Sequence, residues 1–327
     1  NILIGPGSKE LIFQTQLVLN CDLLLPSPSW VSYEPQAKIL NKKTIWIKTY
    51  KKNKWHLTGN DLEKVCKKSK KSKLLILNSP NNPSGTSSEH LKQIAKMAKK
   101  HKVIIIADEI YAELDFSGSY KSIAHYYPEG TIISSGLSKW CGAGGWRIGT
   151  MIFPQNLSYI KDAIRIVASE TFTSVSAPIQ FAAIKAYSKN HQNYLNKSRK
   201  ILKFICEYIF SEFTSNSIEC VQPDGGFYML CSFSKIKKIK QYKFKNSQEM
   251  CKKILSETGF AMLPGSDFGF KKNKLIARIA FVDFDGSKAL KEFSSVKKFN
   301  NNTVMKKIFP NIFNGVNSLL NWLKIKT

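Results

Sequence analysis

One short stretch of the chain, residues 103–108, constrains the fold more than any other. It begins with Val103-Ile-Ile-Ile106, four consecutive β-branched residues, and it ends at Asp108. An uninterrupted β-branched run is typical of a strand that is buried on both faces, as in the middle of a parallel sheet. In folds built on such sheets, ligands bind beyond the carboxyl ends of the strands, which is where Asp108 falls. The stretch therefore predicts an α/β fold with a ligand site beside Asp108.

Predicted strands and helices alternate on both sides of this stretch. Strands are expected at residues 1–4, 23–25, 44–47, 74–77, 131–134 and 150–153, and helices near 11–19, 60–68, 89–100, 157–167, 178–187 and 194–213. After about residue 205 the elements are shorter and mixed, with strands at 225–230 and 275–281, an exposed lysine-rich loop at 234–245, and an amphipathic helix at 310–325. We therefore predict a large domain, 1–204, on a mostly parallel sheet, and a smaller C-terminal α+β domain, 205–327.

Composition suits a globular protein of this size. The chain has 327 residues, of which 43% are apolar, enough for two domains with substantial cores. No apolar run approaches the roughly 20 residues that cross a bilayer, and no signal-peptide pattern is visible, so no membrane partner is expected. The seven cysteines form no C-x-x-C pair. We expect free thiols in a reducing compartment, the cytoplasm or an organelle, and no metal site.

The strong positive charge has two interpretations. The formal net charge is +27, a value that often accompanies binding to nucleic acid or to an anionic surface. Here the excess comes from short lysine clusters that are spread along the chain, for example at 51–54, 67–73 and 235–240. This distribution favours a solvated surface, and salt-sensitive association with polyanions is the alternative.

A second stretch, residues 131–149, places one lysine in unusual surroundings. Lys139 follows a predicted strand, with Trp140 and Trp146 close by in a glycine-rich segment and with Arg147 eight residues on. Apolar surroundings and a neighbouring cation both favour the neutral amine, which can attack a carbonyl and form a Schiff base. A lysine that extends from a loop into solvent is the alternative.

Six motifs together resemble those of class I aminotransferases, the pyridoxal-phosphate enzymes of fold type I. They occur in family order and span nearly the whole chain: Gly7-Ser-Lys9, Pro28-Ser-Trp-Val-Ser-Tyr33, Asn78-Ser-Pro-Asn-Asn-Pro-Ser-Gly85, Ala107-Asp-Glu-Ile-Tyr111, Ser138-Lys139 with Arg147, and Arg278-Ile-Ala-Phe281. Each motif is ordinary alone, but six in one order argue against coincidence. The resemblance, to bacterial-type aspartate aminotransferases in particular, implies the fold type I architecture, a homodimer, and pyridoxal 5'-phosphate as cofactor.

The resemblance also implies a role for each candidate residue. Lys139 would hold the cofactor covalently and then, as a free amine, move a proton between the substrate Cα and the cofactor. Asp108 would keep the pyridine nitrogen protonated, which makes the ring an electron sink. The remaining implied roles are ring stacking by Trp30, hydrogen bonds to the phenolate oxygen from Asn82 and Tyr111, cofactor phosphate binding by Gly7, Ser8, Lys9, Ser138 and Arg147, and orientation of the substrate carboxylate by Arg278 and Asn82.

On the residues alone, these roles have plainer alternatives. Gly7 to Lys9 could be an ordinary helix start, and Asp108 could cap the next element. Trp30 could be a core aromatic, Asn82 a turn residue, and Arg278 a member of a structural ion pair.

Two features of the chain depart from the resembled family. Many relatives carry a serine that contacts the phosphate three residues before the lysine, where this chain has Gly136. This difference weakens the assignment of the phosphate-binding residues more than the assignment of the enzyme class. The family also has a further N-terminal segment that adds a tyrosine from the partner subunit to the phosphate site. We therefore expect the chain to be a fragment that could be inactive or unstable alone.

The expected reaction is transfer of an amino group from an L-amino acid to a 2-oxo acid such as 2-oxoglutarate. In some aspartate-using relatives a lysine at the position of Lys9 meets the distal carboxylate, so aspartate is the expected donor. A lyase on the same fold, either a C–S lyase or a cyclopropane-forming synthase, is the alternative within enzymes. A regulatory domain that senses the cofactor is the alternative from another class, although no helix-turn-helix is visible and nucleic-acid binding is not expected.

Overall fold

The computed structural model describes residues 1–188, 190–293 and 301–324. The chain forms two compact units. The first contains Asn1–Asn81, Ser87–Glu113 and Ser119–His191, and the second contains Asn82–Thr86, Leu114–Gly118 and Gln192–Thr327. The boundaries of these units differ from the predicted domain boundary at residues 204 and 205, which stays a prediction. Within the described residues, no helix has both the length and the apolar character needed to cross a membrane.

The first unit is built on a seven-stranded sheet of order β1-β7-β6-β5-β4-β2-β3. Its strands are β1 (Ile2–Gly5), β2 (Asp22–Ser27), β3 (Thr44–Lys48), β4 (Lys73–Asn78), β5 (Ile104–Asp108), β6 (Thr131–Gly136) and β7 (Gly149–Ile152). The five strands β2 to β6 pair in parallel, whereas β7 is antiparallel to both of its neighbours. The mostly parallel sheet is therefore confirmed, and each predicted strand of this region is present.

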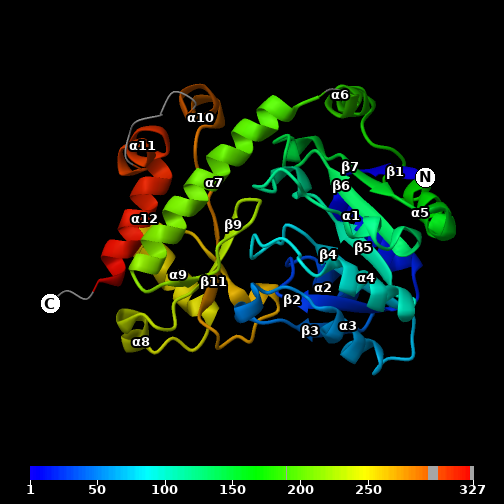
Figure 1. Ribbon diagram of the computed structural model, residues 1–327, viewed down its shortest axis with the longest axis horizontal. Coiled ribbons are helices and arrows are strands. Elements are labelled where there is room, and N and C mark those ends of the chain that lie inside the picture. The colour runs from blue at the N-terminus through cyan, green and yellow to red at the C-terminus, as the bar shows by residue number, and fades with distance from the viewer. Residues whose placement is uncertain (189, 294–300, 325–327) are drawn as a thin grey trace. The chain divides into compact units, whose positions relative to one another are not determined.

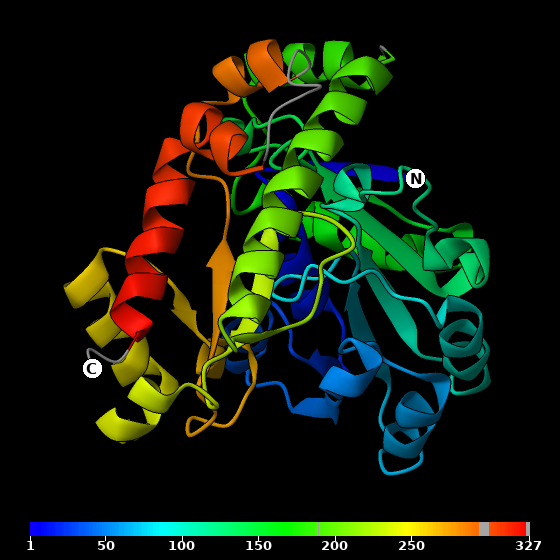
Figure 2. The ribbon, with the colours of Figure 1, turned by 60° about the vertical axis from the view of Figure 1, so that its left-hand side comes forward.

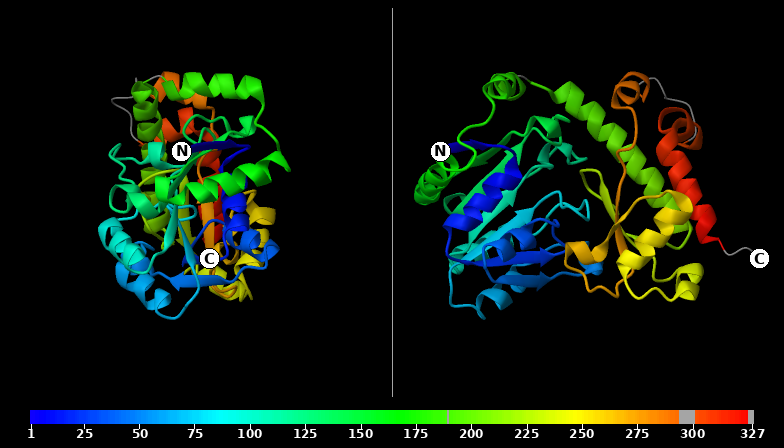
Figure 3. Two further views of the ribbon diagram at one scale, coloured as in Figure 1. Left: turned by 90° about the vertical axis from the view of Figure 1, so that its right-hand side faces the viewer. Right: turned by 180° about the vertical axis from the view of Figure 1, so that it is seen from behind.

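Helices cover both faces of this sheet, as its continuous apolar strands require. On one face a buried cluster joins residues of the sheet to α1 (Ser8–Val18), α2 (Tyr33–Ile39) and α5 (Ser158–Ser169). On the other face a second cluster joins it to α3 (Gly59–Cys66) and α4 (Leu91–Lys100). The left view of Figure 3 shows these helices on the two sides of the sheet. The helix α6 (Ala177–Ser188) completes the unit.

The register of the parallel strands brings polar residues to one edge of the sheet. Asn78 at the end of β4 is paired with Asp108 at the end of β5, which is paired in turn with Ser134 of β6. These are carboxyl ends of neighbouring parallel strands, so they meet at the edge where α/β folds bind ligands. Figure 1 shows β4, β5 and β6 side by side in this unit.

The second unit holds a four-stranded antiparallel sheet of order β10-β11-β9-β8. Its strands are β8 (Glu219–Cys220), β9 (Tyr228–Ser232), β10 (Leu263–Pro264) and β11 (Ile276–Ala280). Its helices are α7 (Gln192–Ser215), α8 (Lys237–Tyr242), α9 (Ser247–Thr258), α10 (Gly286–Glu292), α11 (Asn301–Ile308) and α12 (Pro310–Leu323). Figure 2 shows both α7 and α12, and their Tyr208 and Phe313 rings lie 6.5 Å apart.

The predicted exposed loop at 234–245 is wrong, because α8 forms there. Ile236 and Ile239 are 6% and 0% exposed, so one side of this short helix is buried. The lysines of the segment remain at the surface, where the Lys238 Nζ lies 4.5 Å from the centre of the Trp322 ring. The segment was predicted as a loop because of its many lysines, and the helical spacing of its two isoleucines was overlooked.

Candidate active site

The first feature of the site is the start of α1, where three segments of the first unit meet. Gly7 precedes the helix with φ of 98°, and a Cβ on it would lie 2.1 Å from Nη2 of Arg147. A Cβ on Gly149 would lie 2.3 Å from the backbone nitrogen of Ser8. Both close approaches are possible only for glycine. The guanidinium donates hydrogen bonds of 2.9 Å to the carbonyl oxygens of Pro6 and Gly144.

This arrangement suits an anion. A helix start presents free N–H groups and the positive end of the helix dipole, and here an arginine lies beside them. The Arg147 side chain is exposed and Ser8 is half-buried, so both can reach a ligand. The structure thus brings together Gly7, Ser8 and Arg147 from separate motifs, and their role in phosphate binding stays a prediction. Ser138 is half-buried one position before Lys139, and its predicted phosphate contact stays a prediction.

The second feature is the carboxylate of Asp108, which is 3% exposed at the end of β5. Its Oδ2 accepts a hydrogen bond of 2.5 Å from the Tyr33 hydroxyl, and its Oδ1 accepts one of 3.4 Å from the Ile110 N–H. Burial raises the pKa of Asp108 to about 6, against the lowering effects of these two hydrogen bonds and of the Lys139 charge. A buried anion of this kind needs a cationic partner, and a pyridinium N–H fits that need.

Lys139 comes three residues after the end of β6 and is half-buried. Its Nζ lies 5.9 Å from the centre of the Tyr111 ring, and Tyr111 itself is 4% exposed. Because the Lys139 charge acts on the pKa of Asp108, these side chains share one electrostatic environment. The structure therefore brings Lys139, Asp108 and Tyr111 together at the carboxyl ends of β5 and β6.

An aromatic pair lies beside the start of α1 in the same unit. Trp30 meets Tyr33 edge to face, with ring centres 5.2 Å apart and planes at 81°. The ammonium of Lys9 lies over Trp30, at 5.1 Å from its ring centre. Since Tyr33 also contacts Asp108, the predicted stacking residue and the predicted ring-nitrogen partner are linked through one side chain.

The second unit holds the other part of the predicted site. Arg278 on β11 donates a hydrogen bond of 2.9 Å from Nη1 to Oδ1 of Asn82. Its guanidinium carbon lies 4.2 Å from the ring centre of Tyr228 and 5.1 Å from that of Phe268. Two aromatic faces and an amide oxygen orient the guanidinium, whose planar fork of donors suits a carboxylate. Arg278 and Asn82, which come from separate motifs 196 positions apart, thus contact each other, and their predicted roles in substrate binding stay predictions.

Sequence reasoning missed one residue of this site, Tyr33. Its hydrogen bond to Asp108 spans 75 positions of the chain, and the local sequence offers only an aromatic three residues after Trp30. A buried carboxylate needs a hydrogen-bond donor, so the burial expected for Asp108 could have prompted a search for a donor such as the Tyr33 hydroxyl.

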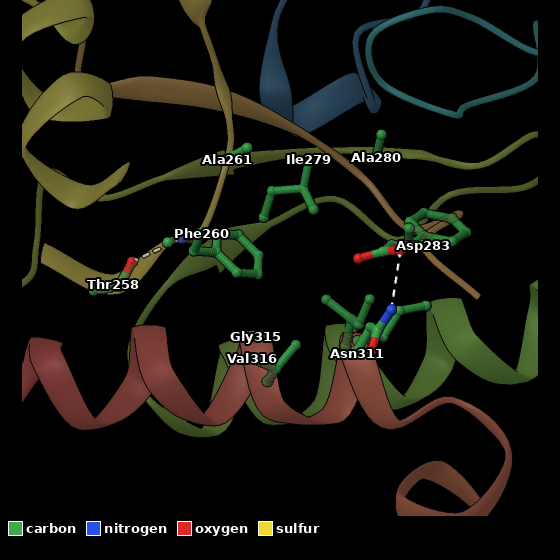
Figure 4. Close-up of a pocket in the computed structure, with 13 residues that line it drawn as sticks. Thr258, Phe260, Ala261, Ile279, Ala280, Asp283, Asn311, Gly315 and Val316 are labelled. Carbon is green, nitrogen blue, oxygen red and sulfur yellow. Dashed lines mark hydrogen bonds between the residues drawn. The ribbon is translucent and has the colours of Figure 1, made fainter. Parts of the chain in front are cut away.

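A separate pocket of the second unit contains none of the predicted site residues. Its volume is about 240 Å³, and it is lined by Ile209, Thr258, Gly259, Phe260, Ala261, Ile279, Ala280, Phe281, Asp283, Asn311, Ile312, Gly315 and Val316. Figure 4 shows apolar and polar side chains in its walls, with the Asn311 amide donating to Asp283, a hydrogen bond of 3.2 Å. The seven cysteines are free thiols, and no group of metal-ligating side chains occurs among the residues that the structure describes.

A lysine at the end of a parallel sheet, a buried carboxylate and a helix-start anion site define a pyridoxal-phosphate enzyme of fold type I. Comparison with known proteins gives the family. The family model for aminotransferase class I and II matches residues 1–285, and the chain belongs to this family. It is therefore a pyridoxal-phosphate-dependent aminotransferase, as the six motifs predict.

Individual relatives agree with this assignment. The chain is 31% identical over 278 residues to an aspartate aminotransferase of Bacillus sp. (strain YM-2), a match that covers 82% of this chain and 69% of the relative. It is 29% identical to an asparagine–oxo-acid transaminase of Streptococcus mutans, over 83% of this chain and 70% of that one. None of these observations favours the alternative of a lyase.

Solved structures confirm the fold. An aromatic aminotransferase from Pyrococcus horikoshii OT3 superposes with a TM-score of 0.80 at 24% identity, covering 98% of this chain and 78% of that chain. An aspartate aminotransferase from Thermus thermophilus with maleate superposes with a TM-score of 0.78, covering 90% of this chain and 75% of that chain. At this level of identity the likeness shows the architecture alone.

Proposed function

We propose that this aminotransferase takes the amino group from aspartate and passes it to a 2-oxo acid such as 2-oxoglutarate. The observation that carries the choice of donor is the ammonium of Lys9, held 5.1 Å from the centre of the Trp30 ring. If Trp30 stacks on the cofactor, Lys9 lies beside the reacting centre, where a second carboxylate on the substrate would find a positive charge. Relatives named aspartate aminotransferase support the same choice.

In the proposed reaction the cofactor, when bound, supplies an electron sink for the bond that breaks at the substrate Cα. Lys139 would hold the cofactor and, as a free amine, would take the proton from the substrate Cα and deliver it to the cofactor carbon. Arg278 orients the substrate carboxylate, because its guanidinium is already held by Tyr228 and Asn82. Asn82 also takes part in binding the cofactor's phenolate oxygen, together with Tyr111.

The remaining residues hold the cofactor in place. Arg147 and Ser8, with the N–H groups at the start of α1, bind the phosphate. Asp108, as a carboxylate, would accept a hydrogen bond from the protonated ring nitrogen, which offsets the cost of its burial. Trp30 covers one face of the ring, a contact that contributes on the order of 1 kcal/mol beyond the buried area.

The substrate proposal is tested by comparing donors. With wild-type holoenzyme, aspartate should react in the half-reaction at least tenfold faster than leucine or phenylalanine. Lys9→Met should lower kcat/KM for aspartate by about tenfold, the effect of losing one charge-assisted contact, and should leave leucine unchanged. Lys38→Met, at an exposed lysine of α2, is the matched control. Equal rates with aspartate and leucine in the wild type would contradict the proposal.

We also propose that the protein is a homodimer of the cytoplasm. Exposed apolar side chains of the first unit support the dimer: Tyr159, Ile166, Phe181, Ile184 and Tyr187 on α5 and α6 are 49–74% exposed, and aromatic side chains are enriched in protein interfaces. Free cysteines support a reducing compartment. Sedimentation should give a dimer that Phe181→Asp weakens, whereas a monomeric wild type would contradict the proposal.

A further inference from the structure

The side chain of Tyr33 connects two parts of the cofactor site. It is the first residue of α2 and is 0% exposed. Its hydroxyl donates to Oδ2 of Asp108 at 2.5 Å, while its ring meets Trp30 edge to face at 5.2 Å. The N–H of Ile110 contacts the other carboxylate oxygen at 3.4 Å, a much longer distance. The hydroxyl of Tyr33 is therefore the stronger of these two donors to Asp108.

The position of Tyr33 is fixed by its helix. One turn further along α2, the Gln36 amide donates to the carbonyl oxygen of Lys9 at 3.0 Å and accepts from Gln16 at 2.9 Å. Both partners belong to α1, whose start forms the anion site. The helix that carries Tyr33 is thus tied to the phosphate end, and its hydroxyl is held towards Asp108.

We propose that Tyr33 is a positioning residue that sets how one proton is shared between Asp108 and the cofactor's ring nitrogen. The inference rests on the role proposed above for Asp108. Two arrangements of this proton are possible, a pyridinium N–H beside a carboxylate or a neutral pyridine beside a carboxylic acid. A hydrogen bond donated to the carboxylate favours the first arrangement, because it stabilises the negative charge. Removing the donor moves the proton from the nitrogen to the oxygen, and no bond other than this N–H is exchanged.

The variant Tyr33→Phe separates the hydroxyl from the ring, since phenylalanine keeps the contact with Trp30. The holoenzyme is loaded with cofactor that carries ¹⁵N in the pyridine ring, and the nitrogen signal is read by NMR. We expect a pyridinium signal in the wild type, a signal shifted towards neutral pyridine in Tyr33→Phe, and a neutral signal in Asp108→Asn. Tyr127→Phe, at a buried tyrosine of the opposite sheet face, is the matched control and should behave as the wild type.

A double-mutant cycle shows whether Tyr33 acts through Asp108. Tyr33→Phe should weaken cofactor binding by about tenfold, the effect of one hydrogen bond to a charged group, but should have no further effect in an Asp108→Asn background. Equal effects in both backgrounds would mean a structural role and would overturn the inference. If Tyr33→Phe does not fold, 3,5-difluorotyrosine at position 33 keeps the shape and strengthens the donor, and it should move the wild-type signal further towards pyridinium.

The outcomes separate the inference from its premise. A wild-type signal in Tyr33→Phe, with a neutral signal in Asp108→Asn, overturns the role of Tyr33 alone. An unchanged signal in Asp108→Asn overturns the role proposed for Asp108, and the inference falls with it.

Discussion

Each of the two units contains an arginine that we propose binds an acidic group, but the two arginines are held in different ways. In the first unit Arg147 is exposed, and it reaches the start of α1 because Gly7 and Gly149 leave room for close backbone approach. In the second unit Arg278 is half-buried, and side chains orient it: the aromatic rings of Tyr228 and Phe268 and the amide of Asn82. The first site therefore depends on backbone geometry, and the second depends on the chemistry of its side chains.

The largest expected effect comes from a substitution that prevents the close backbone approach at the start of α1. A Cβ at Gly149 would lie 2.3 Å from the nitrogen of Ser8 and 2.4 Å from the carbonyl carbon of Gly7, and neither backbone atom can move cheaply. Gly149→Ala should therefore weaken cofactor binding by more than 100-fold, equivalent to at least about 3 kcal/mol. Titration of the variant with pyridoxal phosphate, followed by absorbance, measures this.

The same loop offers a control for that substitution. A Cβ on Gly145 would meet nothing within 4 Å, so Gly145→Ala should bind the cofactor as the wild type does. Equal losses of cofactor affinity in the two variants would mean that the loop is sensitive to any change. Close backbone approach would then not explain the site at Arg147.

The next expected effect is a pH dependence of stability that arises from Asp108 in the first unit. The pKa of Asp108 is raised from 3.8 to about 6 in the folded protein. A folded acid with a raised pKa binds its proton more tightly than the unfolded chain does, so the free energy of unfolding falls as pH rises from about 4 to about 6. For the protein without cofactor this loss amounts to roughly 3 kcal/mol. Arginine does not titrate in this range, so Arg278 adds no such dependence.

Urea unfolding of the cofactor-free protein at pH 4.5, 5.5 and 7 measures this loss. The Asp108→Asn variant should lack the contribution of this carboxyl, because its amide carries no titrating proton. If the wild type and the variant lose stability in parallel over this range, the carboxyl of Asp108 is not the group that titrates.

The smallest of the three effects is expected from Arg278→Lys. Lysine keeps the charge but loses the planar fork and the stacking on Tyr228 and Phe268. KM for the amino donor should rise by about 10- to 100-fold, the value of one bidentate charged contact, with the affinity for pyridoxal phosphate unchanged. Arg165→Lys, at an exposed arginine of α5, is the control. A loss of cofactor affinity in Arg278→Lys with an unchanged KM would contradict the role of this arginine in binding the substrate carboxylate.

Much of the fold could be predicted, because its signals are local. The β-branched run before Asp108 and the helical periods of α4 and α12 each express a pattern that one segment carries by itself. The helix α8 was missed because two buried isoleucines, Ile236 and Ile239, sit among lysines whose charge suggests a loop.

The residues of the site also differ in whether a local sequence pattern could reveal them. Lys139, Asp108 and Arg147 could be proposed because each lies in a motif with a recognisable residue pattern. The hydrogen bond from Tyr33 to Asp108 could not, since it joins α2 to β5 across the fold and no local pattern encodes the contact. Long-range partners of a buried charge follow from packing, and packing is visible only once the sheet and its helices are assembled.

The most direct measurement is borohydride reduction of the holoenzyme followed by mass spectrometry of the protein. If Lys139 is the covalent attachment point, the wild type should gain the mass of one reduced cofactor on the peptide that contains Lys139, and Lys139→Ala should gain none. Covalent cofactor retained by Lys139→Ala in the same amount as by the wild type would contradict the account.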